Sequence, residues 1–165
     1  ISREKGYFAL DWEAARNVPW GVLLLFGGGL ALAGGFKGTG LAEWIGSGVS
    51  GFDVSTWVLV FIVTVAIVYL TEITSNTAST ATFLPILGAV AVGLGLDPRM
   101  LAIPVALGAS MAFMMPVATP PNAIVFSYED MHLGDMVRAG FWLNIVAILV
   151  SFAAMYFLAP IVFGL

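Results

Sequence analysis

The sequence contains no cysteine and little charge, and each absence excludes classes of function. Without cysteine, the 165 residues can form neither disulfides nor thiolate metal sites. Charged residues make up 10% of the chain and hydrophobic residues 60%, whereas a typical soluble domain is about 25% charged. So few charges cannot cover the surface of a soluble domain, and we expect a membrane-embedded protein. The net charge of −4 is spread along the chain and does not indicate a nucleic-acid partner.

Catalytic and metal-binding side chains are also scarce. The chain has a single histidine, His132, which lies in a polar stretch. The sequence has no cluster of histidines and carboxylates at the spacing of a metal site. It also lacks a nucleophile accompanied by a base, which covalent catalysis requires. We therefore predict that the protein is not an enzyme.

The chain instead has long uncharged runs. A helix that spans a membrane needs about 20 mainly apolar residues, and most of these runs reach that length. Glycine and alanine occur at helical positions along them. The sequence therefore predicts an all-α membrane protein. The runs are residues 17–36, 54–71, 73–96, 100–128 and 139–165.

The first 16 residues are polar and mixed in charge, and the chain begins at Ile1 without an initiator methionine. We interpret residues 1–16 as a connecting segment, with a surface helix as the alternative, and the chain as part of a longer protein. Residues 18–36 are predicted to form the first span. Residues 39–52 repeat their apolar side chains at helical spacing, which predicts an amphipathic helix at the membrane interface.

Between residues 54 and 96, two apolar arms enclose a polar tip. Eight of the ten residues from Thr71 to Thr80 are polar or hydroxylic. This pattern predicts a re-entrant hairpin over residues 54–96, with its tip inside the membrane. The alternative is two complete spans with the tip at the surface, and arms of about 17 to 20 residues fit either arrangement. The absence of glycine-, aspartate- and lysine-rich loop residues at the tip favours the hairpin.

A second interruption falls in the run over residues 100–128. Pro120 and Pro121 remove two backbone donors and clash with a continuing helix. We therefore predict a broken transmembrane helix that runs to Thr119 and resumes after the break. Its start is predicted at Asp97, as the N-cap residue, followed by proline at the first helical position.

The end of the chain is predicted to hold a charged loop over residues 129–138 and a last span over residues 139–163. Lysine and arginine collect on the cytoplasmic side of membrane proteins. Along the predicted spans, four of them fall on the side of the N-terminus and two on the other side. We therefore predict that the C-terminus lies outside the cell. The four are Arg3, Lys5, Arg16 and Arg138, and the two are Lys37 and Arg99.

The two interruptions, Ser75-Asn76-Thr77 and Thr119-Pro120-Pro121-Asn122, each lie where one helix ends and another begins. A helix start presents unpaired N–H groups and a partial positive charge. Two starts that face each other form an anion site without lysine or arginine. Carbonyl oxygens at the preceding helix ends suit a hard cation such as Na⁺. The pattern therefore predicts a cation-coupled anion carrier.

Glu72 is a carboxylate at membrane depth if the hairpin is re-entrant. Ionisable groups at that depth are functional signals by default. Glu72 could bind a proton or a cation, or it could only hold the tip together, and the sequence leaves both roles open.

These motifs resemble those of the divalent anion/sodium symporter family, the sodium:dicarboxylate and sodium:sulfate carriers. The resemblance covers nearly the whole chain and implies the C-terminal half of a member. It also implies two inverted repeats, of which the second is present, in a homodimer that works by an elevator motion. The matching residues are Ser75-Asn76-Thr77, Ala109-Ser110, Phe113, Pro116-Val117-Ala118, Asn122 and Ile124-Val125.

The resemblance further implies a function and roles for individual residues. The implied function is sodium-coupled symport of C4-dicarboxylates such as succinate, malate and fumarate across the cell inner membrane. The alternatives are a sulfate, citrate or proton-coupled carrier or exchanger of the same family and, more remotely, a channel or a structural membrane subunit. The implied substrate site contains Ser75, Asn76, Thr77, Thr119 and Pro120. The implied Na⁺ ligands are Thr71, Thr74, Asn76 and the carbonyl of Ala118.

Overall fold

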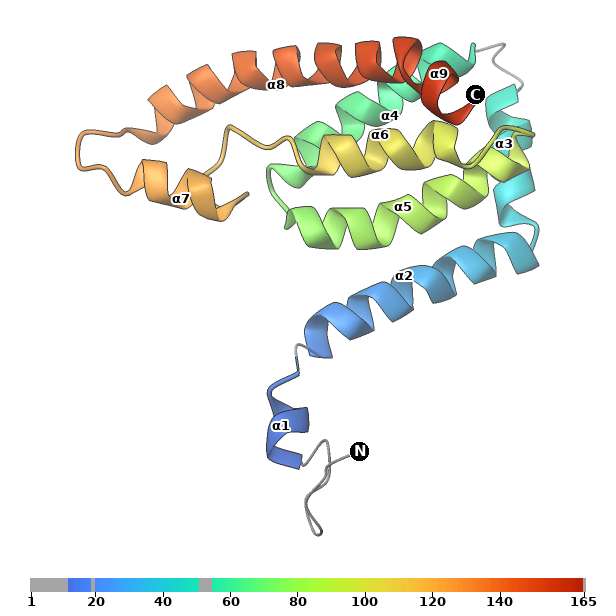
Figure 1. The fold of residues 1–165 in the computed structure, drawn as a ribbon, viewed down its shortest axis with the longest axis horizontal. Coiled ribbons are helices and arrows are strands. Elements are labelled where there is room, and N and C mark those ends of the chain that lie inside the picture. The colour runs from blue at the N-terminus through green and yellow to red at the C-terminus, as the bar shows by residue number, and fades with distance from the viewer. Residues whose placement is uncertain (1–11, 19, 51–54, 165) are drawn as a thin grey trace.

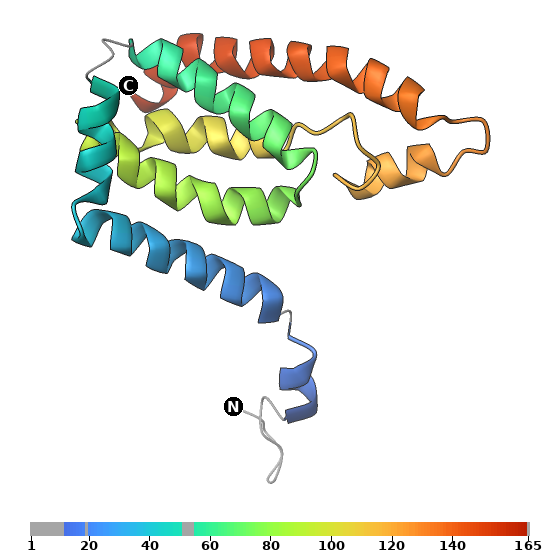
Figure 2. The same ribbon diagram turned by 180° about the vertical axis from the view of Figure 1, so that it is seen from behind.

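A computed structural model of the chain describes residues 12–18, 20–50 and 55–164, and all regular structure in these ranges is helical. The predicted all-α fold is confirmed for this part of the chain. Figures 1 and 2 show α4, α5 and α6 side by side, with α2 along α5 and α8 across α4 and α6. The helices are α1 (Trp12–Arg16), α2 (Trp20–Gly38), α3 (Leu41–Ser50), α4 (Thr56–Thr71), α5 (Asn76–Gly93), α6 (Arg99–Ala109), α7 (Pro120–Phe126), α8 (Leu133–Phe157) and α9 (Ala159–Phe163).

Two of these helices, α5 and α8, are long and apolar enough to cross a membrane, judged by length and composition. The helical ranges Leu23–Gly38, Thr56–Thr71 and Arg99–Ala109 are apolar but shorter. Large apolar side chains, such as Leu24 and Ile161, are exposed on the outside of the bundle. Exposed apolar surface of this extent requires lipid or further protein around it.

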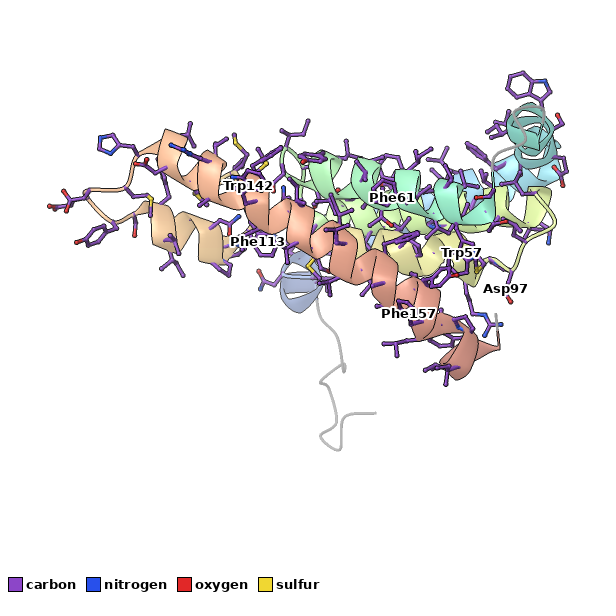
Figure 3. The ribbon with its side chains drawn as sticks, turned by 90° about the horizontal axis from the view of Figure 1, so that it is seen from above. Trp57, Phe61, Asp97, Phe113, Trp142 and Phe157 are labelled. Carbon is purple, nitrogen blue, oxygen red and sulfur yellow. The ribbon has the colours of Figure 1, made fainter. Side chains whose placement is uncertain are left out.

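The apolar core lies between α4, α5, α6 and α8. Fully buried side chains include Val60 of α4, Ala91 of α5 and Leu101 of α6. At the edge of this core, Trp57 of α4 packs edge-on against Phe152 of α8, with 6.3 Å between the ring centroids. Figure 3 shows Trp57 and Phe61 on α4 alongside this helix. The core therefore fixes the position of the turn between α4 and α5.

That turn consists of residues 72–75, and we call it the hairpin turn. The helix before it is capped by Ser55, whose Oγ accepts the N–H of Val58 at 3.4 Å. The helix after it begins at Asn76 with Ser75 as the N-cap residue. The two apolar arms predicted from the sequence are thus helices joined by a short polar turn.

Glycines allow α2 and α3 to approach the backbone of α5. Pro85 of α5 cannot donate a hydrogen bond to the carbonyl of Ala81 one turn earlier. That carbonyl oxygen lies against Gly29 of α2, where a Cβ atom would overlap it. Gly93, at the other end of α5, meets the backbone of Ala42 in α3 in the same way. Small residues of this kind permit close helix packing in membranes.

The helix expected to continue to Thr119 ends instead at Ala109. Residues 110–119 contain turns but no helix, and we call them the unwound segment. The proline pair begins α7 rather than interrupting a helix, which suits proline because the first helical positions need no N–H donor. Helix α6 ends before Thr119 because the carboxylate of Glu72, which directly follows α4, binds the N–H groups of residues 113–115.

Helix α6 begins at Arg99, with Pro98 in the N-cap position, so Asp97 is not the N-cap residue that we predicted. Its Oδ1 nevertheless accepts the N–H of Arg99 at 2.9 Å. The carboxylate of Asp97 also binds the guanidinium of Arg99 at 2.7 Å, and this ion pair holds the start of the helix.

The last long helix, α8, begins at Leu133 rather than at residue 139, so the second half of the expected charged loop is helical. Asp135 lies in its first turn, where a negative charge is favourable. The helix ends at Phe157, and Pro160 begins the short α9. Because proline cannot continue the backbone ladder, it accounts for the end of α8 before residue 163.

Candidate functional site

The side chain of Glu72 joins the hairpin turn to the unwound segment. Its carboxylate is 4% exposed and accepts the backbone N–H groups of residues 113, 114 and 115 at 2.7–3.0 Å. Asn144 of α8 donates its Nδ2 to the same carboxylate at 2.7 Å. In a continuing helix, these N–H groups would bond to carbonyls one turn earlier. The carboxylate therefore replaces the helical ladder, which explains why α6 ends at Ala109.

Asn122 binds carbonyl groups of the unwound segment. The Nδ2 of Asn122 donates to the carbonyls of Ala112 at 2.9 Å and Met115 at 3.0 Å. Asn122 lies in α7, whose N-cap residue Thr119 accepts the N–H of Asn122 at 3.3 Å. The unwound segment is thus held through its N–H groups by Glu72 and through its carbonyls by Asn122.

Helix α8 approaches the unwound segment closely because Gly140 faces it. A Cβ atom at this position would overlap the carbonyl of Phe113 and lie 2.6 Å from the Cα of Met114. Gly140 and Asn144 are one turn apart and share a face of α8. Figure 3 shows Phe113 beside the N-terminal half of this helix. The hairpin turn, the unwound segment and α8 therefore meet at one place.

Three oxygen atoms gather where the hairpin turn passes the end of α6. The Oγ1 of Thr71 lies 2.7 Å from Asn76 Oδ1 and 3.0 Å from the carbonyl oxygen of Ala109. Thr71 is completely buried, and its single hydroxyl hydrogen cannot serve both acceptors fully. A neutral cluster of oxygens at a helix end suits a hard monovalent cation such as Na⁺.

Thr74, another predicted Na⁺ ligand, closes the hairpin turn. Its Oγ1 donates to the carbonyl of Leu70 at 2.9 Å and lies 2.6 Å from the Oγ of Ser79. Ser75 and Thr77 are exposed beside the first turn of α5. The structure therefore brings Thr71 and Asn76 together directly, whereas the hydroxyl of Thr74 bonds to Leu70 and Ser79 instead.

The predicted site residues of the second interruption lie at the C-terminal end of the unwound segment and the start of α7. Ala118 is buried, Thr119 is half-buried at the cap of α7, and Pro120 is exposed. Within the described residues, no hydrogen bond joins residues 118–120 to residues 75–77. The connection runs instead through Glu72 and the N–H groups that it binds.

A cavity of about 410 Å³ lies between α7 and α8. Its lining is mainly apolar, includes Phe113 and Leu143, and carries the carboxylate of Asp135. Neither residues 75–77 nor residues 119–120 line it. Of the two interruptions that predict the anion site, only Asn122 lines the cavity.

Sequence reasoning missed three contributors to this arrangement. The Ala109 carbonyl has no signal in the sequence, because any residue at a helix end supplies one. Asn122 is identified only as part of a motif, without a role. Asn144 carries the clearest signal, since it is a strongly polar residue inside an apolar helix. Its partner, Glu72, lies 72 positions away in the sequence.

Residues 7–164 match the family model described as the sodium:sulfate symporter transmembrane region. The chain is 46% identical over 165 residues to the sodium-dependent dicarboxylate transporter SdcS of Staphylococcus saprophyticus, covering 99% of this chain and 32% of that protein. It is 43% identical over 163 residues to a protein of the same name from Staphylococcus aureus, covering 98% of this chain and 31% of that protein.

The chain thus spans about a third of the length of these relatives, rather than the half that the resemblance implied. The match nevertheless runs through the hairpin turn, the unwound segment and α8. The resemblance noted in the sequence is confirmed, and the relatives' names point to transport rather than catalysis. This chain of membrane helices belongs to the sodium:sulfate symporter transmembrane family.

Proposed function

We propose that the chain is the C-terminal repeat of a sodium-coupled symporter of C4-dicarboxylates in the cell inner membrane. The relatives named as sodium-dependent dicarboxylate transporters support the choice of ion and substrate. The observation that carries the proposal is the oxygen cluster of Thr71, Asn76 and Ala109. It lies between the end of one helix and the start of another, as ion sites in secondary transporters do.

The hairpin turn is proposed to lie near the middle of the membrane. Glu72 binds Asn144, which is the twelfth of the 25 residues of α8. At about 1.5 Å per residue, roughly 17 Å of this helix precede Asn144 and roughly 20 Å follow it. If α8 crosses the membrane, the turn lies at mid-depth, whereas two complete spans would put it at a surface. This geometry supports a re-entrant hairpin and, with residues 110–119 beside it, a broken transmembrane helix.

The substrate carboxylate is proposed to bind at the first turn of α5, against Ser75, Asn76 and Thr77. A second contact is proposed at the first turn of α7, at Thr119 and Pro120. The first-turn N–H groups of α5 have no partner within their helix and carry partial positive charge. Pro120 and Pro121 have no N–H group and the N–H of Asn122 bonds to Thr119, so α7 contributes the hydroxyl of Thr119 instead. A divalent anion is then bound by backbone and hydroxyl donors, without a lysine or an arginine.

Na⁺ is proposed to bind to Thr71, Thr74, Asn76 and the carbonyl of Ala118, with the carbonyl of Ala109 as an additional oxygen. Entry of a divalent anion into a negative interior is opposed by about 2.3 kcal/mol per charge per 100 mV, which favours the entry of more than one Na⁺ with each anion. Protons are a less suitable coupling ion because Glu72 already accepts bonds from Asn144 and three backbone N–H groups.

The inverted repeat, the homodimer, the elevator motion and the outside position of the C-terminus follow from the resemblance and belong to the proposal. A cysteine at Ile73, which is 71% exposed on the hairpin turn, tests the orientation. We expect a membrane-impermeant thiol reagent to label it from outside the cell. A cysteine at Ile62, which is exposed on the side of α4, should stay unlabelled because lipid covers it. Labelling at position 73 from the cytoplasm alone would reverse the orientation.

The test of function is uptake of radiolabelled succinate by liposomes that contain the full-length parent protein. We expect accumulation with an inward Na⁺ gradient and none when K⁺ replaces Na⁺. Uptake that never exceeds equilibrium would contradict symport and indicate a facilitator or an exchanger. Because the matched family is described by sulfate, labelled sulfate is the second substrate to test. Na⁺-driven accumulation of sulfate without succinate would replace the proposed substrate.

A further inference from the structure

The carboxylate of Glu72 is buried without a positive partner in the part of the chain that the structure describes. The ion pairs in that part of the chain join Arg99 to Asp97 and His132 to Asp135. Neither pair includes Glu72 or a residue that bonds to it. All contacts of the Glu72 carboxylate are with N–H donors, which is the pattern of the ionised form. A buried anion stabilised only by dipoles leaves a net negative charge where Glu72 meets the unwound segment and α8.

This charge lies next to the proposed cation site but outside its oxygen cluster. Glu72 directly follows Thr71, whose hydroxyl bonds to Asn76 and Ala109. The carboxylate itself points to the unwound segment, where both of its oxygens bind backbone N–H groups. It therefore has the position to attract a cation through space without serving as a ligand.

The same carboxylate determines where the unwound segment lies. It binds three consecutive N–H groups, and Asn144 and Gly140 fix the carboxylate and the segment against α8. The segment begins directly after the carbonyl of Ala109 and ends at Ala118 and Thr119. A shift of the segment would displace the adjoining carbonyl of Ala109 from the hydroxyl of Thr71, which it now accepts at 3.0 Å.

We propose that Glu72, fixed by Asn144 and Gly140, is a positioning residue that sets the Na⁺ affinity of the site at Thr71 and Asn76. It acts by its charge and by holding the unwound segment, and neither Na⁺ nor a proton binds to it. The proposal rests on the proposed function, because it requires that the oxygen cluster binds Na⁺.

The test measures Na⁺ binding without transport. Full-length protein in detergent is unfolded by heat at a series of Na⁺ concentrations, with K⁺ keeping the ionic strength constant. A ligand that binds only the folded state raises the midpoint with its concentration, which gives an apparent Na⁺ affinity. Succinate uptake by the same wild-type protein is measured in parallel.

Glu72→Gln removes the charge and places an amide N–H₂ group against N–H donors. We expect its apparent Na⁺ affinity to fall at least tenfold. Glu43→Gln is the matched control, because Glu43 is an exposed carboxylate on α3 at the opposite end of the bundle. It should bind Na⁺ within twofold of the wild-type protein.

Asn144→Leu keeps the charge of Glu72 and removes one of its hydrogen-bond donors, so it tests whether the position of the carboxylate affects Na⁺ binding. It also tests the inference if Glu72→Gln does not fold. We expect its Na⁺ affinity to fall at least threefold. A role in folding alone would lower the midpoint in K⁺ and leave the Na⁺ affinity unchanged, which would overturn the inference. If the wild-type protein shows neither a Na⁺-dependent midpoint nor Na⁺-driven uptake, the proposed function itself fails. If the wild-type protein shows both and the two variants bind Na⁺ normally, only the inference fails.

Discussion

The hairpin turn and the unwound segment both interrupt helices within the apolar bundle, but they are stabilised in different ways. The hairpin turn is short, and hydroxyl groups in and beside it bind partners nearby in the sequence: Thr74 binds Leu70, and Thr71 at the end of α4 binds Asn76. The N–H groups of the unwound segment bind Glu72, which lies 41 residues before Phe113. The hydroxyl contacts of the first interruption are therefore mainly local, apart from the bond of Thr71 to Ala109, whereas the second interruption depends on the tertiary fold.

The largest effect is expected from Gly140→Ala, which breaks the packing of the unwound segment only. The new Cβ would overlap the carbonyl of Phe113, and backbone cannot give way as a flexible side chain can. We expect the free energy of unfolding in detergent to fall by about 3 kcal/mol, with loss of uptake.

Gly134→Ala is the matched control for this change. It lies in the first turn of the same helix, and a Cβ there meets nothing within 4 Å. Its stability should rise or change by less than about 1 kcal/mol. Equal destabilisation by the two substitutions would show that α8 does not pack against the segment as described.

Asn76→Ala should separate function from stability at the hairpin turn. It removes the Oδ1 that meets Thr71, so we expect uptake to fall on the order of 100-fold, as for a lost metal-site contact. The α5 helix should persist, because its other first-turn contacts remain. Uptake in liposomes measures the loss of function, and circular dichroism measures the helix content. Asn17→Ala, at an exposed asparagine, is the control. Wild-type uptake by Asn76→Ala would remove Asn76 from the site.

The two interruptions also differ in how far the sequence predicts them. The hydroxyl-rich stretch from Thr71 to Thr80 correctly predicts a polar turn between two helices, because its hydroxyl groups bind mainly their own neighbours. The proline pair predicts the start of α7 but not the end of α6 at Ala109. That end depends on a carboxylate and an amide that reach the segment from other helices. No local pattern in residues 100–119 contains this information.

A smaller effect is expected from Ser79→Ala within the hairpin turn. Ser79 is buried, and its Oγ lies 2.6 Å from the Oγ1 of Thr74. Loss of one hydrogen bond should lower the free energy of unfolding by about 1 kcal/mol, because Thr74 keeps its bond to Leu70. Ser47→Ala on α3, where the serine is exposed, should have no measurable effect. A cost similar to that of Gly140→Ala would show that the turn, like the segment, depends on non-local packing.

The smallest effect is expected at Asp97, far from both interruptions. The side-chain hydrogen bond from Arg99, and then its backbone N–H, lower the pKa of Asp97 from 3.8 to about 2. A lowered pKa stabilises the folded state above the unfolded value, and this stabilisation is lost as the pH falls through about 2. Solvent around the pair keeps the effect small.

Asp97→Asn should therefore lose slightly less thermal stability than the wild-type protein between about pH 4 and about pH 2. Thermal unfolding of both proteins across this range provides the measurement. Parallel curves would mean that the ion pair at the start of α6 adds nothing to stability.

The contact between the carbonyl of Ala81 and Gly29 ties together two positions on different helices. Pro85 leaves that carbonyl without its usual donor, and only glycine on α2 leaves room for it. A relative with another residue at position 85 would regain the donor, and the carbonyl would return to the ladder of α5. The need for glycine at position 29 would then disappear. In an alignment of relatives, positions 29 and 85 should therefore covary, with larger residues at 29 found where proline is absent at 85.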